Sequence, residues 1–514
     1  MHAARPPHGN VLFITVDQFR GDCLSAMGHP LVKTPSLDRL AGEGVLFTNH
    51  WAQATPCGPS RACLYTGTYL HQNRSVLNGT PLDARFANVA LEARAAGWDP
   101  VLFGYTDSSI DPRTVEDDDD RLRTYEGVLP GFRAVLDFPF EPLTPWIGWL
   151  ADRGYPIPDD PQEIFRGDQA FPGADSHESS WAPPIYSAEH SETAFLTNEL
   201  LEWLDTQNDE PWFVHASYLR PHTPYRVVAP FHDLYDPADV PLPTRASTRE
   251  VEGASHPFAE LALSVIGAPA DEAKMRQIRA TYYGMIAELD HHLGRVFDWL
   301  DESGRAADTL VVLTSDHGDQ LGDHWLMEKL GYWDASYHVP LIVRDPRVPI
   351  DRRGGRVAAF TEHVDVMPTM LDWMGIDIPS QCDGRSLLPF LAGTDVAEPA
   401  DWRQQAHWQW DFRSPSTHAA EDALGLTMEQ CSLDVIRDHR WKYVHFAGMA
   451  PLLFDLRNDP GQLCNLADDV TYASVVAEYA GKLLSWRMRH GDRTLTGTEL
   501  TRSGAVTRVD PRVG

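Results

Sequence analysis

The stretch Cys57-Gly58-Pro59-Ser60-Arg61, followed by Thr66-Gly67, is the most informative segment of the chain. Pro59 restricts the backbone at the point where a helix can start, because proline is tolerated in the first turn of a helix. Cys57 is therefore expected at the positive N-terminal end of that helix, a position suited to an anion. Arg61 adds a permanent positive charge that can neutralise such an anion. The segment predicts that Cys57 lies in an anion-binding site.

The composition is that of a large globular protein with an acidic surface. At 514 residues the chain can bury a large core, and we expect one big domain with a smaller companion. The formal net charge of −31 and the pI near 5 argue against nucleic acid or an anionic membrane surface as a partner. A small anionic substrate must therefore meet a local positive site.

Cysteine usage and hydropathy indicate the compartment. The six cysteines, at positions 23, 57, 63, 382, 431 and 464, have no C-x-x-C spacing, so neither a disulfide scaffold nor a zinc finger is indicated. No stretch reaches the length of a membrane span, and the apolar run at 11–16 is too short for a signal peptide. We interpret this pattern as a reducing, cytoplasmic compartment with no membrane partner.

Short apolar runs alternate with helical periodicities along the first 390 residues. A long helix is predicted at 271–303, where apolar residues recur every three and four positions and Gly304 can end the helix. Strands that alternate with helices predict an α/β fold of the alkaline-phosphatase-like type, a large mostly parallel sheet between helices. Buried strands are predicted at 11–16, 100–105, 212–217, 310–314 and 339–343.

Two regions depart from this alternation. Residues 116–187 are rich in Pro, Gly and Asp, and we predict an insertion over the sheet rather than a part of it. After residue 390 the pattern changes to short strands joined by tight turns. We therefore divide the chain into a catalytic domain at 1–390 and a smaller C-terminal subdomain at 391–514.

The C-terminal subdomain is predicted to contain a small antiparallel sheet and one helix. Its strands are expected at 432–437, 441–446 and 452–456, and its helix at about 473–489. The tail at 495–514 has no core pattern, and we expect it to pack on another subunit.

Polar side chains at two predicted strand ends indicate a metal site. Asp17 and Gln18 follow the first strand, and Asp316-His317-Gly318 follows another, at the carboxyl ends where α/β sheets collect ligands. Carboxylates, an amide oxygen and an imidazole suit a fairly hard divalent ion, with Mn²⁺ favoured and Ca²⁺ or Zn²⁺ as alternatives. Each pair alone is weak evidence, since an Asp after a strand can equally cap a helix. Together with Cys57 they predict one metal ion held by Asp17, Gln18, Cys57, Asp316 and His317.

These motifs closely resemble those of the sulfatase branch of the alkaline phosphatase superfamily. In that branch a formylglycine-generating enzyme reads C-x-P-x-R and oxidises the Cys to formylglycine (3-oxoalanine), whose hydrated aldehyde is the nucleophile. An unmodified thiolate is the alternative, as in cysteine-based phosphatases, but their phosphate loop is of the C-x5-R type and needs no metal. Further matches lie in Thr34-Pro35-Ser36-Leu37-Asp38-Arg39-Leu40, Pro221-His222-x-Pro224, the segment from His363 to Leu371, and Phe454-Asp455-Leu456.

Within the superfamily the chain looks most like the phosphonate monoester hydrolases. This resemblance implies hydrolysis of phosphonate monoesters and phosphodiesters, with weaker action on sulfate, sulfonate and phosphate monoesters. An arylsulfatase-type hydrolase of sulfuric esters is the neighbouring alternative. A homotetramer that uses the C-terminal tail is also implied. The matching segments are Thr80-Pro81-Leu82-Asp83 after Asn78, Gly104-Tyr105-Thr106, Lys329-Leu330-Gly331-Tyr332, Asp411-Phe412-Arg413 and Lys442-Tyr443-Val444-His445-Phe446.

The resemblance also implies roles for individual residues. His222 and Lys329 would hold the non-bridging oxygens or protonate the leaving group, and Arg61 would act beside the nucleophile at Cys57. Asn78 and Tyr105 would line the substrate pocket. The rarity of lysine adds weight to Lys329, because only five of the 43 basic residues are lysines.

Two residues depart from the family pattern. Asp107 stands where the hydrolases compared have Thr, and His338 stands where sulfatases usually have Arg. A carboxylate near a bound anion costs Coulomb energy unless it meets a cation. Our hypothesis is that Asp107 pairs with an amine on the substrate, which is then cationic or zwitterionic, or with Arg113. A non-catalytic relative that only binds is disfavoured, because Cys57 and the other expected site residues are all present.

Overall fold

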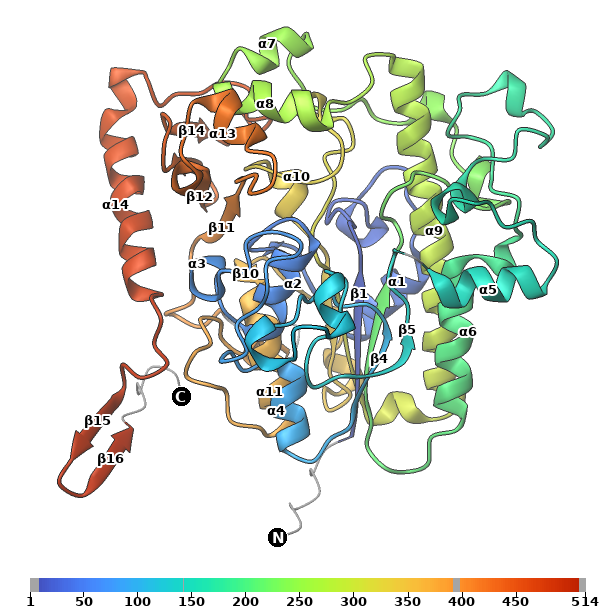
Figure 1. Ribbon diagram of the computed structural model, residues 1–514, viewed down its shortest axis with the longest axis horizontal. Coiled ribbons are helices and arrows are strands. Elements are labelled where there is room, and N and C mark those ends of the chain that lie inside the picture. The colour runs from blue at the N-terminus through green and yellow to red at the C-terminus, as the bar shows by residue number, and fades with distance from the viewer. Residues whose placement is uncertain (1–8, 142, 392–397, 508–514) are drawn as a thin grey trace.

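A computed structural model describes residues 9–141, 143–391 and 398–507, and its centre is an eight-stranded sheet (Figure 1). The strand order is β5-β4-β6-β1-β7-β8-β2-β9, and among these strands only β8 runs antiparallel to its neighbours. The predicted large, mostly parallel sheet is therefore confirmed. Its strands are β1 (Asn10–Val16), β2 (Val45–Phe47), β4 (Pro100–Gly104), β5 (Arg133–Asp137), β6 (Phe213–Tyr218), β7 (Thr309–Ser315), β8 (Leu341–Arg344) and β9 (Gly355–Val357).

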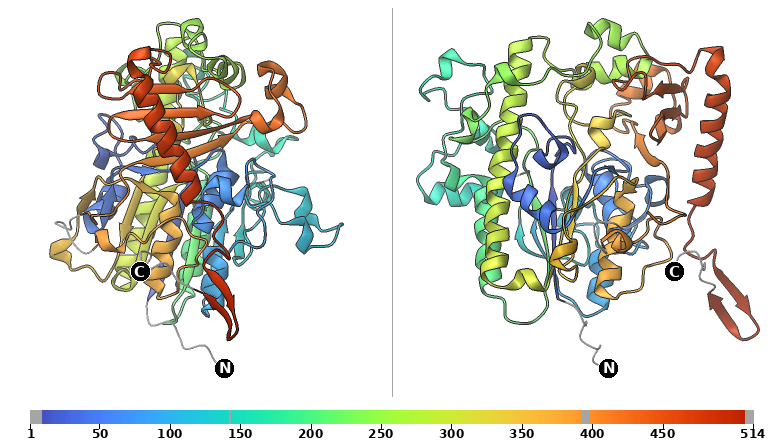
Figure 2. Two further views of the ribbon diagram at one scale, coloured as in Figure 1. Left: turned by 90° about the vertical axis from the view of Figure 1, so that its left-hand side faces the viewer. Right: turned by 180° about the vertical axis from the view of Figure 1, so that it is seen from behind.

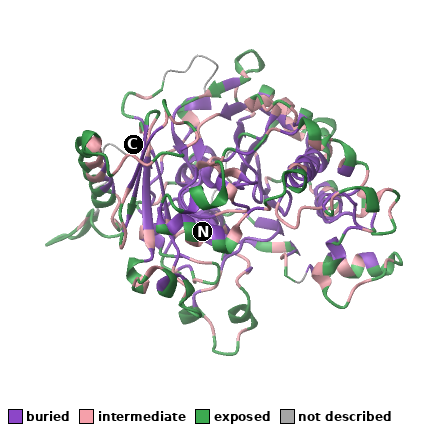
Figure 3. Cartoon of the chain, turned by 90° about the horizontal axis from the view of Figure 1, so that it is seen from above, coloured by how far each residue is buried: buried purple, intermediate pink, exposed green. Residues whose placement is uncertain are grey.

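The central strand β1 is buried on both sides and separates two layers of helices. Leu12 and Ile14 face a core shared with α1 (Pro35–Glu43), α6 (Glu192–Asp205) and α9 (Glu272–Glu302). The alternate residues of β1 face α2 (Cys57–Thr66), α4 (Val89–Ala95) and α11 (Val366–Met374). Burial on both faces explains why the strand reads as a continuous apolar run. Figure 3 shows the buried strands enclosed by helices whose outer faces are exposed.

The register of β1 positions the site. Val16 pairs with Tyr218 of β6 and with Ser315 of β7, so the carboxyl ends of these three parallel strands lie at one edge. The residues that follow β1 and β7 therefore meet at this edge of the sheet. The shorter helices are α3 (Leu70–Asn73), α5 (Thr144–Asp152), α7 (Arg249–Gly253), α8 (Pro257–Ile266), α10 (Asp334–Tyr337), α12 (Leu388–Leu391) and α13 (Ala419–Leu424).

The C-terminal region forms the predicted antiparallel sheet with a helix packed on it. The strands follow one another as β11 (Ala406–Asp411), β12 (Ser432–Arg437), β13 (Trp441–Phe446) and β14 (Leu452–Asp455). Helix α14 (Ala473–Arg489) packs its Tyr479, Leu483 and Trp486 side chains against this sheet. The sequence prediction omitted β11, and the boundary at residue 390 stays a prediction.

The tail forms an exposed hairpin, β15 (Thr498–Thr501) and β16 (Gly504–Thr507), up to the last described residue. It projects from the body of the molecule in Figure 1 and in the right-hand view of Figure 2. The rest of the predicted tail, 508–514, lies outside the described residues. Among the described residues, no helix combines the length and the apolar character needed to cross a bilayer.

One sequence prediction needs correction, and one strand has a direction that the sequence did not specify. Residues 116–187 were expected outside the sheet, but Arg133–Asp137 within them forms the edge strand β5, paired in parallel with β4. The Gly and Pro residues around β5 obscured a strand of only five residues. The strand predicted at 339–343 forms as β8 but runs antiparallel to β7, a direction that an apolar run does not reveal.

Candidate active site

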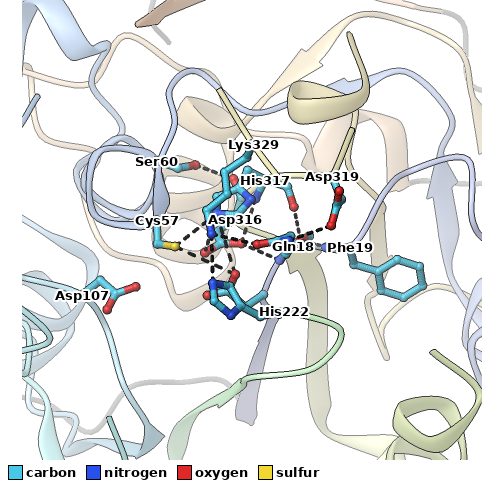
Figure 4. Close-up of polar contacts among 12 residues, drawn as sticks. Gln18, Phe19, Cys57, Ser60, Asp107, His222, Asp316, His317, Asp319 and Lys329 are labelled. Atoms are coloured by element: carbon cyan, nitrogen blue, oxygen red, sulfur yellow. Dashed lines mark hydrogen bonds and ion pairs between the residues drawn. The ribbon is translucent and has the colours of Figure 1, made fainter. Parts of the chain in front are cut away.

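Four predicted metal ligands meet at the carboxyl edge of the sheet. Asp17 follows β1, Asp316 and His317 follow β7, and Cys57 is the first residue of α2. One potential ligand atom from each residue lies within 4.8 Å of the others, and all four residues are buried. Figure 4 shows Cys57, Asp316 and His317 of this cluster side by side. The structure thus brings together residues 17, 57, 316 and 317 as the sequence predicted.

His317 is held in the tautomer that a metal ligand requires. Its Nδ1 donates a hydrogen bond to the carbonyl oxygen of Gly318 over 3.0 Å, so Nε2 carries the free lone pair. Nε2 faces the cluster, 3.2 Å from Sγ of Cys57 and 3.7 Å from Oδ1 of Asp17. Burial lowers the pKa of His317, which keeps the imidazole neutral and able to coordinate.

Arg61 lies in a group of carboxylates that carries more negative than positive charge. Its Nε donates to Oδ2 of Asp316 over 2.9 Å, and its Nη2 donates to Oδ2 of Asp17 over 3.1 Å. Asp107 places Oδ2 3.4 Å from the same Nε. The two carboxylates of Asp17 and Asp316 thus share one guanidinium, and their excess of negative charge suits a further cation. The donor set and its charge fit one divalent metal ion.

The N-terminus of α2 holds Cys57 beside this cluster. Ser60 donates its hydroxyl hydrogen bond to the carbonyl oxygen of Asp316, which fastens the first turn of α2 to the end of β7. Burial raises the pKa of the Cys57 thiol, and the charge of Asp17 raises it further. Both effects favour the thiol form of the unmodified side chain over the thiolate.

Lys329 donates hydrogen bonds to two further predicted site residues, Gln18 and His222. Its Nζ donates to Oε1 of Gln18 over 2.8 Å and to Nε2 of His222 over 2.9 Å. The Nδ1 of His222 donates to the carbonyl oxygen of Thr223. Burial would lower the pKa of Lys329, but the charges of Cys57 and Asp17 raise it above its usual value. An ammonium therefore lies next to the nucleophile position, and metal binding by Gln18 stays a prediction.

Asp319 is a site residue that the sequence analysis missed. Its Oδ2 accepts hydrogen bonds from Nε2 of Gln18 and from the hydroxyl of Tyr225, both over 2.7 Å. These contacts orient the Gln18 amide so that its oxygen faces Lys329. Gln18 also has a φ of 67°, an uncommon backbone conformation for a non-glycine residue. The sequence signal that could have identified Asp319 is its position two residues after His317, in the same loop.

Tyr105 and Asn78 each contact residues of the site. The Tyr105 hydroxyl donates to Oδ2 of Asp17 over 2.6 Å, and its ring lies 4.5 Å from the Arg61 guanidinium carbon. Asn78 is exposed, and its Oδ1 accepts from the backbone N–H of Gly58. Both residues support the predicted cluster, whereas their contact with substrate stays a prediction.

The structure tests one expectation about the departures and gives the contact of the other. The pairing of Asp107 with Arg113 is wrong, because Arg113 donates to Asp111 and to Asp83 instead. Asp111 lies two residues before Arg113 in the same turn, so it binds the Arg113 guanidinium at short range. His338 donates from Nε2 to the carbonyl oxygen of Thr48 over 3.1 Å.

Comparison with known proteins places the chain in a family. The sulfatase family model matches residues 9–376, and the model described as N-sulphoglucosamine sulphohydrolase, C-terminal, matches residues 322–489. The multifunctional alkaline phosphatase superfamily protein PehA of Trinickia caryophylli is 43% identical, over 97% of this chain and 99% of that protein.

Two solved structures are similar over nearly their whole length. The phosphonate monoester hydrolase of Agrobacterium radiobacter has a TM-score of 0.93 and 47% identity, covering 98% of this chain and 100% of that one. The phosphonate monoester hydrolase of Silicibacter pomeroyi has a TM-score of 0.91 and 39% identity, covering 97% and 99%. The chain therefore belongs to the sulfatase family of the alkaline phosphatase superfamily and is a hydrolase of ester bonds.

Proposed function

We propose that the protein is a metal-dependent hydrolase of phosphonate monoesters and phosphodiesters, with weaker action on sulfate and other phosphate esters. The observation that carries this proposal is the 47% identity to a phosphonate monoester hydrolase over nearly the whole chain. The cluster of Asp17, Cys57, Asp316 and His317 supports it, because it combines metal ligands with the nucleophile position.

Two groups complete the proposed site. Asp17, Asp316, His317 and Gln18 would hold one divalent metal ion, with Mn²⁺ favoured and Ca²⁺ or Zn²⁺ as alternatives. The ion supplies Lewis-acid stabilisation of charge on the reacting ester. Formylglycine formed from Cys57 supplies a hydroxyl nucleophile. A formylglycine-generating enzyme would be the transient partner that makes it.

The remaining side chains bind and orient the ester. Lys329 is the protonated group that faces the site, so it would hold the ester oxygens or give a proton to the leaving oxygen. His222 accepts from Lys329, and its pKa is lowered to about 3, by burial first and then by Lys329. His222 is therefore neutral at pH 7 and orients the ammonium, which leaves Lys329 as the charged partner of the ester oxygens.

The test is a substrate panel on metal-loaded protein. The panel contains an aryl phosphonate monoester, an aryl phosphodiester and an aryl sulfate. They share one aryl leaving group and differ only in the phosphorus or sulfur group that is attacked. We expect kcat/KM for the two phosphorus esters to exceed that for the sulfate. Turnover of the sulfate above the diester would instead favour the second candidate, an arylsulfatase, which the sulfatase family match supports.

The same proposal covers assembly and compartment. A homotetramer built through the C-terminal tail would cover the exposed side chains of Leu495 and Leu500, since an isolated two-stranded hairpin is marginally stable in water. Deletion of residues 495–514 should lower the oligomer mass measured by light scattering.

A cytoplasmic site of action is supported by the six free thiols, of which five are buried.

A further inference from the structure

Asp107 is a buried carboxyl group whose contacts do not satisfy it. Its side chain is 3% exposed, and among the described residues none donates a hydrogen bond to it. Its ion-pair partner in the described part of the chain is Arg61, whose Nε already donates to Asp316. Figure 4 shows Asp107 directed toward Cys57 without a polar contact to the other residues drawn. A carboxyl group buried in this way ionises readily only when a further cation approaches it.

The neighbourhood of Asp107 adds negative charge rather than positive charge. Burial raises the pKa of the Asp107 carboxyl, Arg61 opposes this, and the charges of Asp17 and Glu126 raise it further. Glu126 is itself buried, and its carboxylate accepts the backbone N–H groups of Phe140 and Glu141. An incoming cation would therefore stabilise the ionised form of Asp107.

Aromatic side chains lie in the same corner of the site. The ring of Phe140 lies 5.4 Å from that of His222, in an edge-to-face arrangement. The half-buried Tyr125 lies two residues before Gly127, whose carbonyl oxygen accepts hydrogen bonds from Thr106 and Ser108, the two neighbours of Asp107. Carboxylates beside aromatic rings are the surroundings that bind ammonium and quaternary ammonium groups.

The backbone at Asp107 is also unusual. Its φ of 48° lies in the left-handed region, which costs free energy for a non-glycine residue and persists where the surrounding structure requires it. The backbone carbonyl of Asp107 would lie only 3.1 Å from a Cβ added at Gly58, next to the nucleophile position. The main chain therefore places Asp107 beside Cys57, and its side chain adds only the ion pair with Arg61.

We propose that Asp107 is a specificity-determining residue that binds a cationic group on the substrate, so that the enzyme selects zwitterionic phosphonate monoesters and phosphodiesters. The amine or quaternary ammonium would lie on the substituent next to phosphorus. This inference rests on the proposed function. It also suits a chain with a net charge of −31, because a zwitterionic ester is repelled less than an anionic one.

The test compares two 4-nitrophenyl phosphodiesters with the same leaving group. One carries a 2-(trimethylammonio)ethyl group, and the other carries the isosteric neutral 3,3-dimethylbutyl group. With metal-loaded protein containing formylglycine, we expect kcat/KM for the cationic ester to be about tenfold higher, the ratio that about 1.4 kcal/mol of charge interaction produces. A ratio near one would overturn the inference while leaving the proposed function intact.

Variants of Asp107 separate specificity from structure. Asp107→Asn and Asp107→Thr should lower the cationic-to-neutral ratio at least fivefold, and Asp107→Thr should raise turnover of the neutral ester. Arg113→Ala is the matched control from the same loop and should keep the parental ratio, because Arg113 binds Asp83 and Asp111. An unchanged ratio in both Asp107 variants would contradict the inference. If the unsubstituted protein hydrolyses neither ester, both the proposed function and this inference are contradicted.

Discussion

The ammonium of Lys329 donates a hydrogen bond across 2.9 Å to Nε2 of His222, a ring that is neutral at pH 7. The same ammonium donates to the Gln18 amide oxygen, whose orientation is fixed by Asp319. One cation at the site therefore depends on neighbours that come from three separate loops. Because these side chains depend on one another, variants that combine two substitutions can measure how far each residue acts through its neighbour.

Lys329 and His222 should act as one unit. Lys329→Ala should lower kcat/KM about 10²- to 10³-fold, as loss of a donor to developing charge does in other hydrolases. His222→Ala should cost less, because the ammonium remains. The double variant should fall short of the product of the single effects by at least about fivefold. Strictly multiplicative losses would contradict the contact, and the exposed Lys274→Ala serves as a control with parental rates.

Tyr105 should control metal affinity. Tyr105→Phe removes the 2.6 Å hydrogen bond to Asp17 and leaves the ring beside Arg61. Loss of a partner behind a metal ligand typically weakens metal affinity 10- to 100-fold. Titration of Mn²⁺ by calorimetry should show this weakening, while kcat at saturating metal stays within a few-fold of the parent. Tyr218→Phe, on β6 with a hydroxyl bonded to Thr197, is the matched control, and equal affinities in both variants would refute the role.

Asp319 should position Gln18. Asp319→Ala frees the Gln18 amide to rotate, so we expect kcat/KM to fall about 10- to 100-fold without loss of the fold. Tyr225→Phe removes the other donor to Asp319 and should have a smaller effect. If Asp319→Ala and Gln18→Ala lower kcat/KM independently, so that their losses multiply, Asp319 does not act through Gln18. Thermal unfolding of each variant is the check on folding.

His292 should make the protein less stable in acid. It lies in α9, and burial lowers its pKa from 6.5 to about 3. Between these values the unfolded chain binds a proton that the native state does not, so this group destabilises the fold as the pH falls below 6.5. From pH 7.5 to pH 5.0 the free energy of unfolding of His292→Gln should gain up to about 2 kcal/mol relative to the parent. Urea denaturation at both pH values measures it, and a constant difference would contradict the assignment.

The fold was predictable where the sequence pattern is strong. Apolar runs buried on both faces read directly as β1, β6 and β7, and the repeat of apolar residues located α9 within one residue at each end. The short edge strand β5 was missed, because its five residues alternate in burial among turn-forming residues. The direction of β8 depends on tertiary pairing, which a single run does not encode.

The site was predictable to the extent that its residues carry motifs. Asp17, Asp316 and His317 were predicted from strand ends, and the register of β1 with β7 explains why they meet. The Tyr105 contact to Asp17 and the Asp319 contact to Gln18 depend on side-chain direction, so sequence spacing did not reveal them. The same limit led to the wrong pairing of Asp107 with Arg113, since a guanidinium binds the nearest carboxylates first.

The central claim is that Cys57 is converted to formylglycine and acts within the metal cluster. Mass analysis of the peptide that contains residue 57 tests this most directly, on protein produced together with a formylglycine-generating enzyme and shown to be active. We predict a mass in which the thiol is replaced by an aldehyde, trapped as an oxime by hydroxylamine, with activity proportional to the modified fraction. Active protein in which residue 57 keeps its sulfur would contradict the account.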